Sequence, residues 1–173
     1  MNPNHRQSHR LQYYDYSREG IYFITICTHD RQCLFGDISE NSMILNNLGK
    51  IAEKCWNNIP LHFPHMALDS YIIMPNHIHG IISINQAIKK GEYYSPLQSR
   101  GTSKTIGSAI RGFKIGVTQW ARKNTAFHDL WQRDYYEHVV RNEVSLNQIK
   151  EYIIHNPETW ERDKLHPSHN ITT

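Results

Sequence analysis

The sequence has few cysteines, no long apolar run and little excess charge. Its three cysteines, in a chain of 173 residues, lack the paired spacing of a thiolate metal site, and an odd number cannot all be joined in disulfides within one chain. We therefore interpret Cys27, Cys33 and Cys55 as reduced thiols. We expect Cys27 and Cys55 to lie in the core.

No apolar run approaches the roughly 20 residues of a membrane span, and the mean hydropathy is −0.63. Residues 1–6 are not followed by the apolar stretch of a secretory signal. We therefore expect a cytoplasmic protein with no membrane partner. The net charge of +3 does not by itself indicate a nucleic-acid partner, and no glycine-rich phosphate-binding loop indicates the use of a nucleoside triphosphate.

Histidine and tyrosine are abundant instead, with 12 and 10 residues. His77 and His79 follow a Met-Pro-Asn turn and begin an isoleucine-rich segment, residues 77–84, that predicts a strand. Because successive strand side chains point to opposite faces, both imidazoles project from one face. This arrangement can aim two ligands at one metal ion. The alternative interpretation is a pair of polar residues on the solvated face of a half-buried strand.

The periodicity of the remaining sequence predicts an α+β, ferredoxin-like βαββαβ sandwich with one added C-terminal helix. In this topology the first and third strands are central neighbours, so the histidine strand is central. The predicted elements are strands at 21–28, 66–73, 77–84 and within 127–140, and helices at 43–59 (capped by Ser42 or Asn41), 104–123 and 143–155 (capped by Asn142 and ended by Pro157).

The polar segments predict the domain organisation. Residues 1–12 carry basic side chains without an apolar period and are interpreted as a flexible basic arm. Residues 13–160 are predicted to form a single domain, interrupted by a long polar loop at 85–103. Residues 161–173 are predicted to be a polar, frayed tail.

The last predicted helix offers a partner for the histidines. Gln148, Tyr152 and Asn156 recur every four residues and stack along one side of the helix, which could face the edge of the sheet. Two imidazoles and an amide oxygen would form a three-ligand metal site, and a tyrosine one turn away would be the nucleophile. The alternatives are a half-buried aromatic residue and an ordinary helix-end asparagine.

Four segments in this order resemble the REP-associated tyrosine transposases, which belong to the single-tyrosine HUH class. The resemblance covers roughly residues 10–160. It rests on Tyr14-Asp15-Tyr16-Ser17 with the strand after Gly20, on Met74-Pro75-Asn76-His77-Ile78-His79, on Trp131-Gln132 with Tyr135-Tyr136-Glu137-His138-Val139-Val140-Arg141-Asn142, and on Tyr152-Ile153-Ile154-His155-Asn156-Pro157.

The resemblance implies an HUH fold whose added C-terminal helix carries the nucleophile, Tyr152. It implies that His77, His79 and Asn156 hold a divalent metal ion, Mg²⁺ or Mn²⁺, with His155 as a rival third ligand. Tyr135 and Tyr136 are rival nucleophiles by residue type, and the family pattern makes them structural.

The implied function is a metal-dependent single-stranded DNA endonuclease and transposase that cleaves and rejoins DNA near hairpins through a covalent 5′-phosphotyrosine. The implied partner is single-stranded DNA with a REP-like hairpin, and both homodimers and monomers occur among such proteins. The alternatives are a replication or mobilisation nickase, a domesticated non-catalytic hairpin-binding protein, and a simple metal-dependent hydrolase. Predicted DNA contacts are phosphate-binding Arg6, Arg10, Arg111 and Lys114 and base-stacking Tyr13, Tyr14 or Tyr16.

Overall fold

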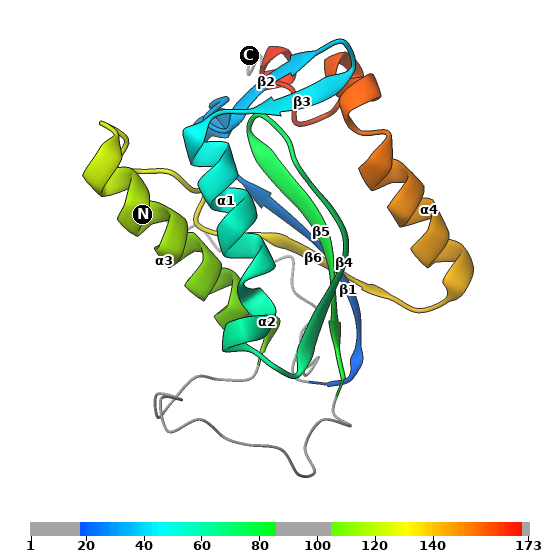
Figure 1. Ribbon diagram of the computed structural model, residues 1–173. Helices are drawn as coiled ribbons and strands as arrows, with labels where there is room; N and C mark the ends of the chain where they lie inside the picture. The colour runs from blue at the N-terminus through cyan, green and yellow to red at the C-terminus, as the bar shows by residue number, and fades with distance from the viewer. Residues whose placement is uncertain (1–17, 86–104, 171–173) are drawn as a thin grey trace, which may run out of the picture.

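The computed structural model describes residues 18–85 and 105–170 (Figure 1). The predicted basic arm and all but the first residue of the predicted loop at 85–103 lie outside these residues. So do five of the predicted DNA contacts: Arg6, Arg10, Tyr13, Tyr14 and Tyr16.

A four-stranded antiparallel sheet forms the middle of the molecule, in the order β4-β5-β1-β6. The strands are β1 (Gly20–Cys27), β4 (Met66–Ile73), β5 (His77–Ile84) and β6 (Tyr136–Val140). The two central strands, β1 and β5, are dense in isoleucine, which suits a strand buried on both faces. The order confirms the predicted ferredoxin-like sheet and places the histidine strand at its centre.

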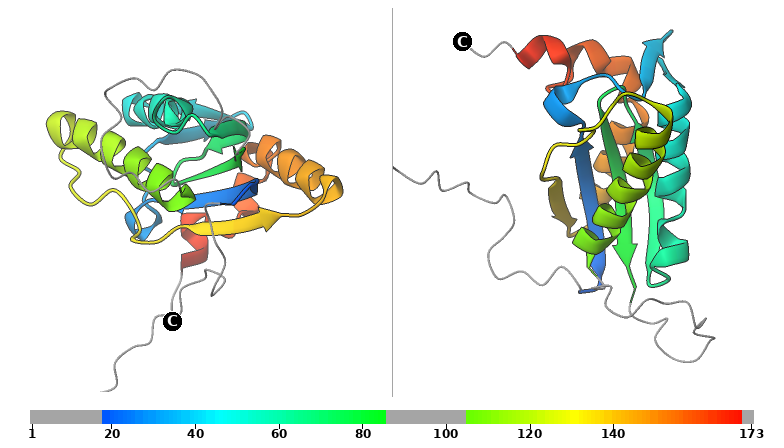
Figure 2. Two further views of the ribbon diagram at one scale, coloured as in Figure 1. Left: turned by 90° about the horizontal axis from the view of Figure 1, so that it is seen from below. Right: turned by 90° about the vertical axis from the view of Figure 1, so that its left-hand side faces the viewer.

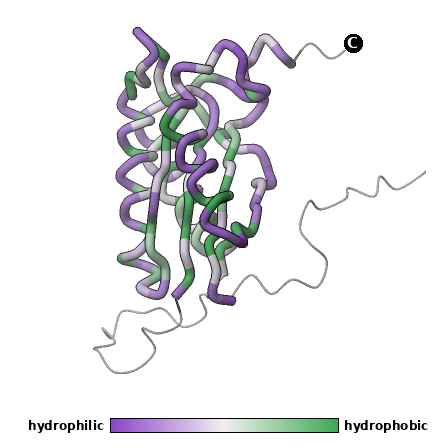
Figure 3. The backbone as a smooth tube through the Cα atoms, turned by 90° about the vertical axis from the view of Figure 1, so that its right-hand side faces the viewer, coloured by the Kyte–Doolittle hydropathy of each residue, from purple (hydrophilic) through white to green (hydrophobic). Residues whose placement is uncertain are grey.

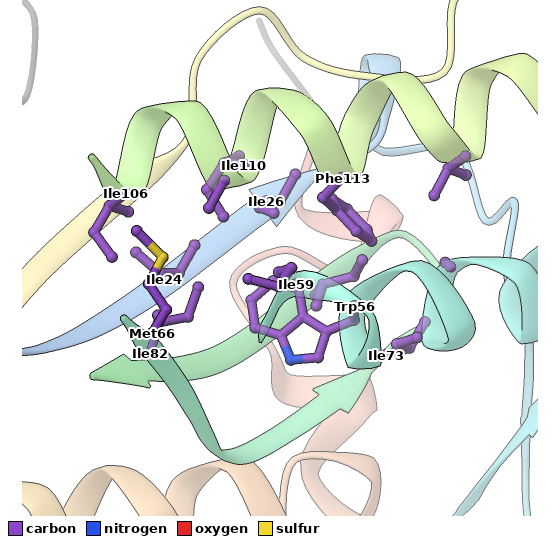
Figure 4. Close-up of a cluster of buried hydrophobic side chains, with 14 of the residues drawn as sticks. Ile24, Ile26, Trp56, Ile59, Met66, Ile73, Ile82, Ile106, Ile110 and Phe113 are labelled. Atoms are coloured by element: carbon purple, nitrogen blue, oxygen red, sulfur yellow. The ribbon is translucent and has the colours of Figure 1, made fainter. Parts of the chain in front are cut away.

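Helices cover the two faces of the sheet unequally (Figure 2). One face is covered by α1 (Asn47–Asn57), α2 (Ile59–His62) and α3 (Ile106–Asn124), and α4 (Glu143–Ile154) lies on the other. The main core lies between the sheet and the first group of helices, where Trp56, Ile110 and Phe113 meet Ile24 and Ile26 (Figure 4). On the second face, an ion pair of 2.7 Å joins Lys150 of α4 to Asp69 of β4.

The hydropathy of the chain follows this arrangement. Hydrophobic segments gather in the middle of the molecule and hydrophilic ones along its outer turns (Figure 3). Among residues 18–85 and 105–170, no helix combines the length and apolar composition needed to cross a bilayer. Cys27 and Cys55 are half-buried rather than core residues, Cys33 is exposed, and all three are free thiols.

The start of the predicted helix at 43–59 was wrong. Residues 36–45 instead form a hairpin of β2 (Gly36–Ser39) and β3 (Ser42–Leu45). Glu40 and Asn41 make its turn with positive φ angles of 50° and 58°, the left-handed conformation that matches the twist of a tight hairpin. Helix α1 begins after Asn46, whose side chain accepts a hydrogen bond from the Gly49 amide at 2.9 Å.

The C-terminal segment also differs from the prediction. Asn142 caps α4 as expected, accepting from the Ser145 amide at 2.8 Å. Pro157, however, does not force Asn156 out of helical geometry: Asn156 has φ −59° and ψ −40°. The chain continues into the 3₁₀ helices η3 (Pro157–Arg162) and η4 (Pro167–Asn170). The prediction of a frayed tail was therefore wrong for residues 161–170.

Candidate metal and tyrosine site

His77 and His79 lie side by side on the face of the sheet that carries α4. In the pairing of β5 with β1, His77 stands opposite Cys27 and His79 opposite Thr25. The imidazole centroids are 4.5 Å apart, and His77 and His79 are 0% and 3% exposed. The two rings therefore share one buried environment, as the spacing predicted.

The turn before β5 fixes the orientation of the His77 ring. The amide nitrogen of Asn76 donates to the carbonyl oxygens of Arg31 at 3.0 Å and Leu165 at 2.7 Å. Its amide oxygen must therefore be the acceptor in the 2.7 Å hydrogen bond with Nδ1 of His77. Nδ1 consequently carries the proton, and Nε2 presents a lone pair. Within the described residues this buried Nε2 has no hydrogen-bond partner.

His79 connects the sheet to α4. A hydrogen bond of 2.8 Å joins its Nδ1 to the hydroxyl oxygen of Thr25, and one of 3.1 Å joins its Nε2 to the hydroxyl of Tyr152. Burial lowers the pKa of His77 to about 3, and burial together with the neighbouring His77 lowers the pKa of His79 well below its ordinary value. Both rings are therefore neutral at pH 7, which is the form that binds metal ions.

Tyr152 points from α4 toward the centre of the sheet rather than its edge. Its ring centroid is 5.1 Å from that of His79 and 6.3 Å from that of Phe23. Tyr152 is 45% exposed, so the residue is packed against the sheet and still partly open to solvent. Burial first, and then the negative charge of Asp163, raise the pKa of Tyr152 to about 12.

Asn156 and Asp163 complete the buried end of the site. Nδ2 of Asn156 donates to Oδ2 of Asp163 at 3.0 Å, and Oδ1 of Asn156 is buried with no hydrogen-bond partner among the described residues. Asp163 is 8% exposed, and one potential ligand atom each from His77, His79 and Asp163 lies within 4.8 Å of the others. These acceptor atoms are all of kinds that bind divalent cations.

The sequence did not reveal Asp163 or Arg31. Asp163 stands in a segment predicted to be frayed, and no periodic pattern marks it. Arg31, at the end of the 3₁₀ helix η1 (His29–Arg31), donates from its guanidinium to the carbonyl of Lys164 at 3.0 Å. Its positive charge further lowers the pKa of His77. The site therefore includes a carboxylate and a cation that motif spacing could not place there.

Several other residues singled out from the sequence lie away from this cluster. His155 is exposed, and its ring nitrogens each lie 3.2 Å from a carboxylate, of Glu151 and of Glu158. Gln148 is exposed on α4. The hydroxyl of Tyr135 donates to Glu137 at 3.0 Å.

Arg111 and Lys114 belong to α3, on the opposite face of the sheet from α4. Arg111 is exposed. The ammonium of Lys114 donates to the carbonyl oxygens of Gln132 at 2.8 Å and Asp134 at 3.2 Å, and burial lowers its pKa to about 8. Lys114 thus supports the segment that leads into β6, and the role of both residues in DNA binding stays a prediction.

Comparisons with known proteins give a relative in sequence and a solved structure with a similar fold. No protein-family model matches the sequence. An uncharacterized protein of Haemophilus influenzae is 52% identical over 170 residues, which cover 94% of each chain. The solved structure of a REP-associated tyrosine transposase bound to a REP hairpin superposes with a TM-score of 0.61 and 17% identity, covering 87% of this chain and 74% of the other. The chain therefore belongs to one family with the Haemophilus influenzae protein, and its fold is that of a REP-associated tyrosine transposase.

Proposed function

We propose that this protein is a metal-dependent single-stranded DNA endonuclease and strand-transfer enzyme of the HUH transposase type, with Tyr152 as its nucleophile. One observation carries the proposal: the Tyr152 hydroxyl lies 3.1 Å from Nε2 of His79, beside two buried acceptor atoms without partners. A phenol hydroxyl next to an incomplete ligand set is an arrangement that suits metal-assisted phosphoryl transfer to tyrosine.

The donor set fits a divalent cation. An unpartnered buried polar atom costs about 1–3 kcal/mol, and two such atoms, Nε2 of His77 and Oδ1 of Asn156, belong to the same site. We propose His77, His79 and Asn156 as ligands, with the Asp163 carboxylate adding negative charge close to them. Imidazole ligands favour Mn²⁺ over Mg²⁺. When bound, the cation polarises the scissile phosphate as a Lewis acid.

The reaction exchanges one phosphodiester for another. The Tyr152 oxygen attacks phosphorus, and the new P–O bond forms as the bond to the 3′ oxygen breaks. The released 3′ oxygen takes up a proton from solvent, so the products are a 5′-phosphotyrosine and a 3′-hydroxyl. Attack by a 3′-hydroxyl on the phosphotyrosine reverses the exchange and rejoins DNA. No nucleoside triphosphate is consumed, because the energy of the bond is retained in the protein–DNA link.

The proton of Tyr152 has to leave during the attack, since a phenol with a pKa of about 12 is almost wholly protonated at pH 7. Nε2 of His79 cannot hold a cation and accept this proton at the same time. The carboxylate of Asp163 is the other basic group whose charge and hydrogen bonding act on the phenol. We therefore assign Asp163 as the group that takes the proton.

The likeness to a transposase bound to a REP hairpin supports DNA with a hairpin as the substrate of this chain. The decisive experiment incubates an end-labelled hairpin oligonucleotide, carrying a single-stranded extension, with the protein and Mn²⁺. The products are separated on a denaturing gel. The wild type should form a covalent protein–DNA adduct, Tyr152→Phe should form none, and the control Tyr135→Phe should retain it.

The alternatives predict other outcomes of this gel. Cleavage without an adduct would indicate a hydrolase. An intact oligonucleotide on this gel, together with hairpin binding on a native gel, would indicate a non-catalytic binding protein. An adduct in Tyr152→Phe would overturn the assignment of the nucleophile. Assembly as a homodimer stays a prediction.

A further inference from the structure

The site opens onto a half of the sheet that α4 leaves uncovered. Helix α4 packs over the β4 side, where Lys150 pairs with Asp69, and β1 and β6 lie beyond it (Figure 2). In the strand pairing Thr25 stands opposite both His79 and Tyr136, and Phe23 stands opposite His138. Because paired residues share a face, these side chains all lie on the face of the site.

Several aromatic side chains share this face. The Phe23 ring stacks on His79 with centroids 5.3 Å apart and planes inclined by 26°, and it meets the Tyr152 ring edge-on. Beside β1, the strand β6 adds His138, which is exposed, and Tyr136, which is 49% exposed. We call Phe23, Tyr136 and His138 the aromatic surface. It begins at the proposed nucleophile and ends on the edge strand.

The charge of this face suits a polyanion. On β1, β5 and β6, the residues that share it are Ile21, Phe23, Thr25, Cys27, His77, His79, Ile81, Ser83, Tyr136, His138 and Val140, and none of these is acidic. The acidic Asp69, on the β4 side of the same face, is paired with Lys150 of α4. The one carboxylate of β6, Glu137, alternates to the opposite face and is buried. Arg141, directly after β6, is exposed and can approach a phosphate at the edge of the surface.

We propose that the aromatic surface binds the single-stranded DNA that adjoins the scissile phosphate, with unpaired bases stacked on Tyr136 and Phe23. This inference rests on the proposed function and deepens it by naming where the substrate strand runs. Among the described residues the ring of Tyr136 is exposed and that of Phe23 is partly exposed. Such rings suit unpaired bases, because the faces of paired bases in a duplex are already stacked on each other. Stacking of this kind tolerates many sequences, so the surface would position the strand, and hairpin recognition would reside elsewhere.

The test measures binding without cleavage, in a Tyr152→Phe background. Fluorescence anisotropy compares two labelled DNAs, a blunt hairpin and the same hairpin with a single-stranded extension. Tyr136→Ala should weaken binding of the extended hairpin by about five- to 100-fold and leave the blunt hairpin within about twofold. Tyr136→Phe, which keeps the ring, should bind as the parent does. Phe127→Ala, which removes a 43% exposed ring outside the sheet, is the matched control.

Each other outcome overturns the inference. Equal affinities of Tyr136→Ala and its parent for the extended hairpin would show that the ring is not used, and equal losses on both DNAs would show general damage. Tyr136-dependent binding that is stronger for an RNA extension would assign the surface to a different occupant. Failure of the proposed function is recognised separately: the wild type, with Tyr152 intact, would then form no adduct even if binding depended on Tyr136.

Discussion

Nδ2 of Asn156 donates a hydrogen bond of 3.0 Å to Oδ2 of Asp163, and this bond decides which atom of the amide faces the histidines. Because the nitrogen is held by the carboxylate, the oxygen is left inside the site without a partner among the described residues. Asp163 is itself held by the Leu165 amide, which donates to Oδ1 at 2.6 Å. Asp163 therefore acts on the proposed ligand Asn156 through a fixed contact.

Replacing Asp163 tests this contact. Asp163→Ala should lower the affinity for Mn²⁺ by about 10- to 100-fold, the usual effect of removing a group that orients a metal ligand. Asp163→Asn should lose less of its affinity for Mn²⁺, because its amide oxygen can still accept the hydrogen bond from Nδ2 of Asn156. Isothermal titration calorimetry measures both affinities. Glu161→Ala, which changes an 87% exposed carboxylate two residues away, is the control. Equal affinities in all four proteins would contradict the prediction.

Asn76 should control the tautomer of His77. It binds Nδ1 of His77 and two carbonyl groups, so Asn76→Ala removes the reason for the proton to stay on Nδ1. We expect Nε2 to become partly protonated and the affinity for Mn²⁺ to fall by about tenfold or more. Nitrogen-15 NMR of labelled histidine reports the tautomer directly.

The control for the variant Asn76→Ala is Asn124→Ala, which changes an exposed asparagine at the end of α3. Loss of the three hydrogen bonds of the buried Asn76 side chain should also destabilise Asn76→Ala. Metal affinity is therefore compared at a temperature where both variants are folded by circular dichroism. An unchanged Nδ1-protonated ring in Asn76→Ala would show that another group holds the tautomer.

The two buried histidines should make the metal-free protein sensitive to acid. The pKa of His77 is about 3 when folded and about 6.5 when unfolded. Between these values the unfolded chain binds more protons, so stability falls as the pH falls. At about 1.4 kcal/mol per pH unit, His77 alone should lower the free energy of unfolding by about 2 kcal/mol from pH 6.5 to pH 5. His79 adds in the same direction.

Urea denaturation in the presence of a chelator, at pH 7 and at pH 5, measures this change. The variant His77→Asn, His79→Asn should lose most of the difference between the two pH values. A wild type that is equally stable at both would show that the rings are not buried as neutral groups.

Gly80 should be intolerant of a side chain. It follows His79 on β5, and a Cβ at this position would overlap the ring of Trp56, which is fully buried on the core face. Gly80→Ala should therefore destabilise the protein by about 1–3 kcal/mol through overpacking, measured by thermal or urea denaturation. Gly112→Ala, where the added Cβ would make only an ordinary contact with Phe63, is the matched control. Equal effects at both positions would contradict the argument.

The sequence predicted the sheet and the histidine pair because both depend on local periodicity. The isoleucine-rich run after His77 predicts a strand, and the alternation of strand side chains puts His77 and His79 on one face. The hairpin at 36–45 was missed because its turn uses Glu40 and Asn41 at positive φ, without the glycine that usually marks such a turn. The prediction therefore assigned residues 43–45 to the first turn of the helix that follows.

The rest of the site depends on contacts between distant parts of the chain. Asn76 binds Leu165, 89 residues away, and Arg31 binds Lys164, 133 residues away. No spacing rule connects such positions. Pro157 predicted the end of the last helix, and the polar composition of residues 161–173 predicted a frayed tail. Proline is, however, well suited to the first turn of a helix, and here Pro157 begins the segment that brings Asp163 to the histidines.

These contacts have a consequence for the newly made protein. During synthesis the histidine strand and then Tyr152 leave the ribosome before Asp163, Lys164 and Leu165 do. A nascent chain thus carries a phenol and two imidazoles while the amide of Asn156 and the turn at Asn76 still lack their partners. The proposed metal site is therefore complete only when the segment that follows Tyr152 in the chain has brought Asp163 and Leu165 to Asn156 and Asn76.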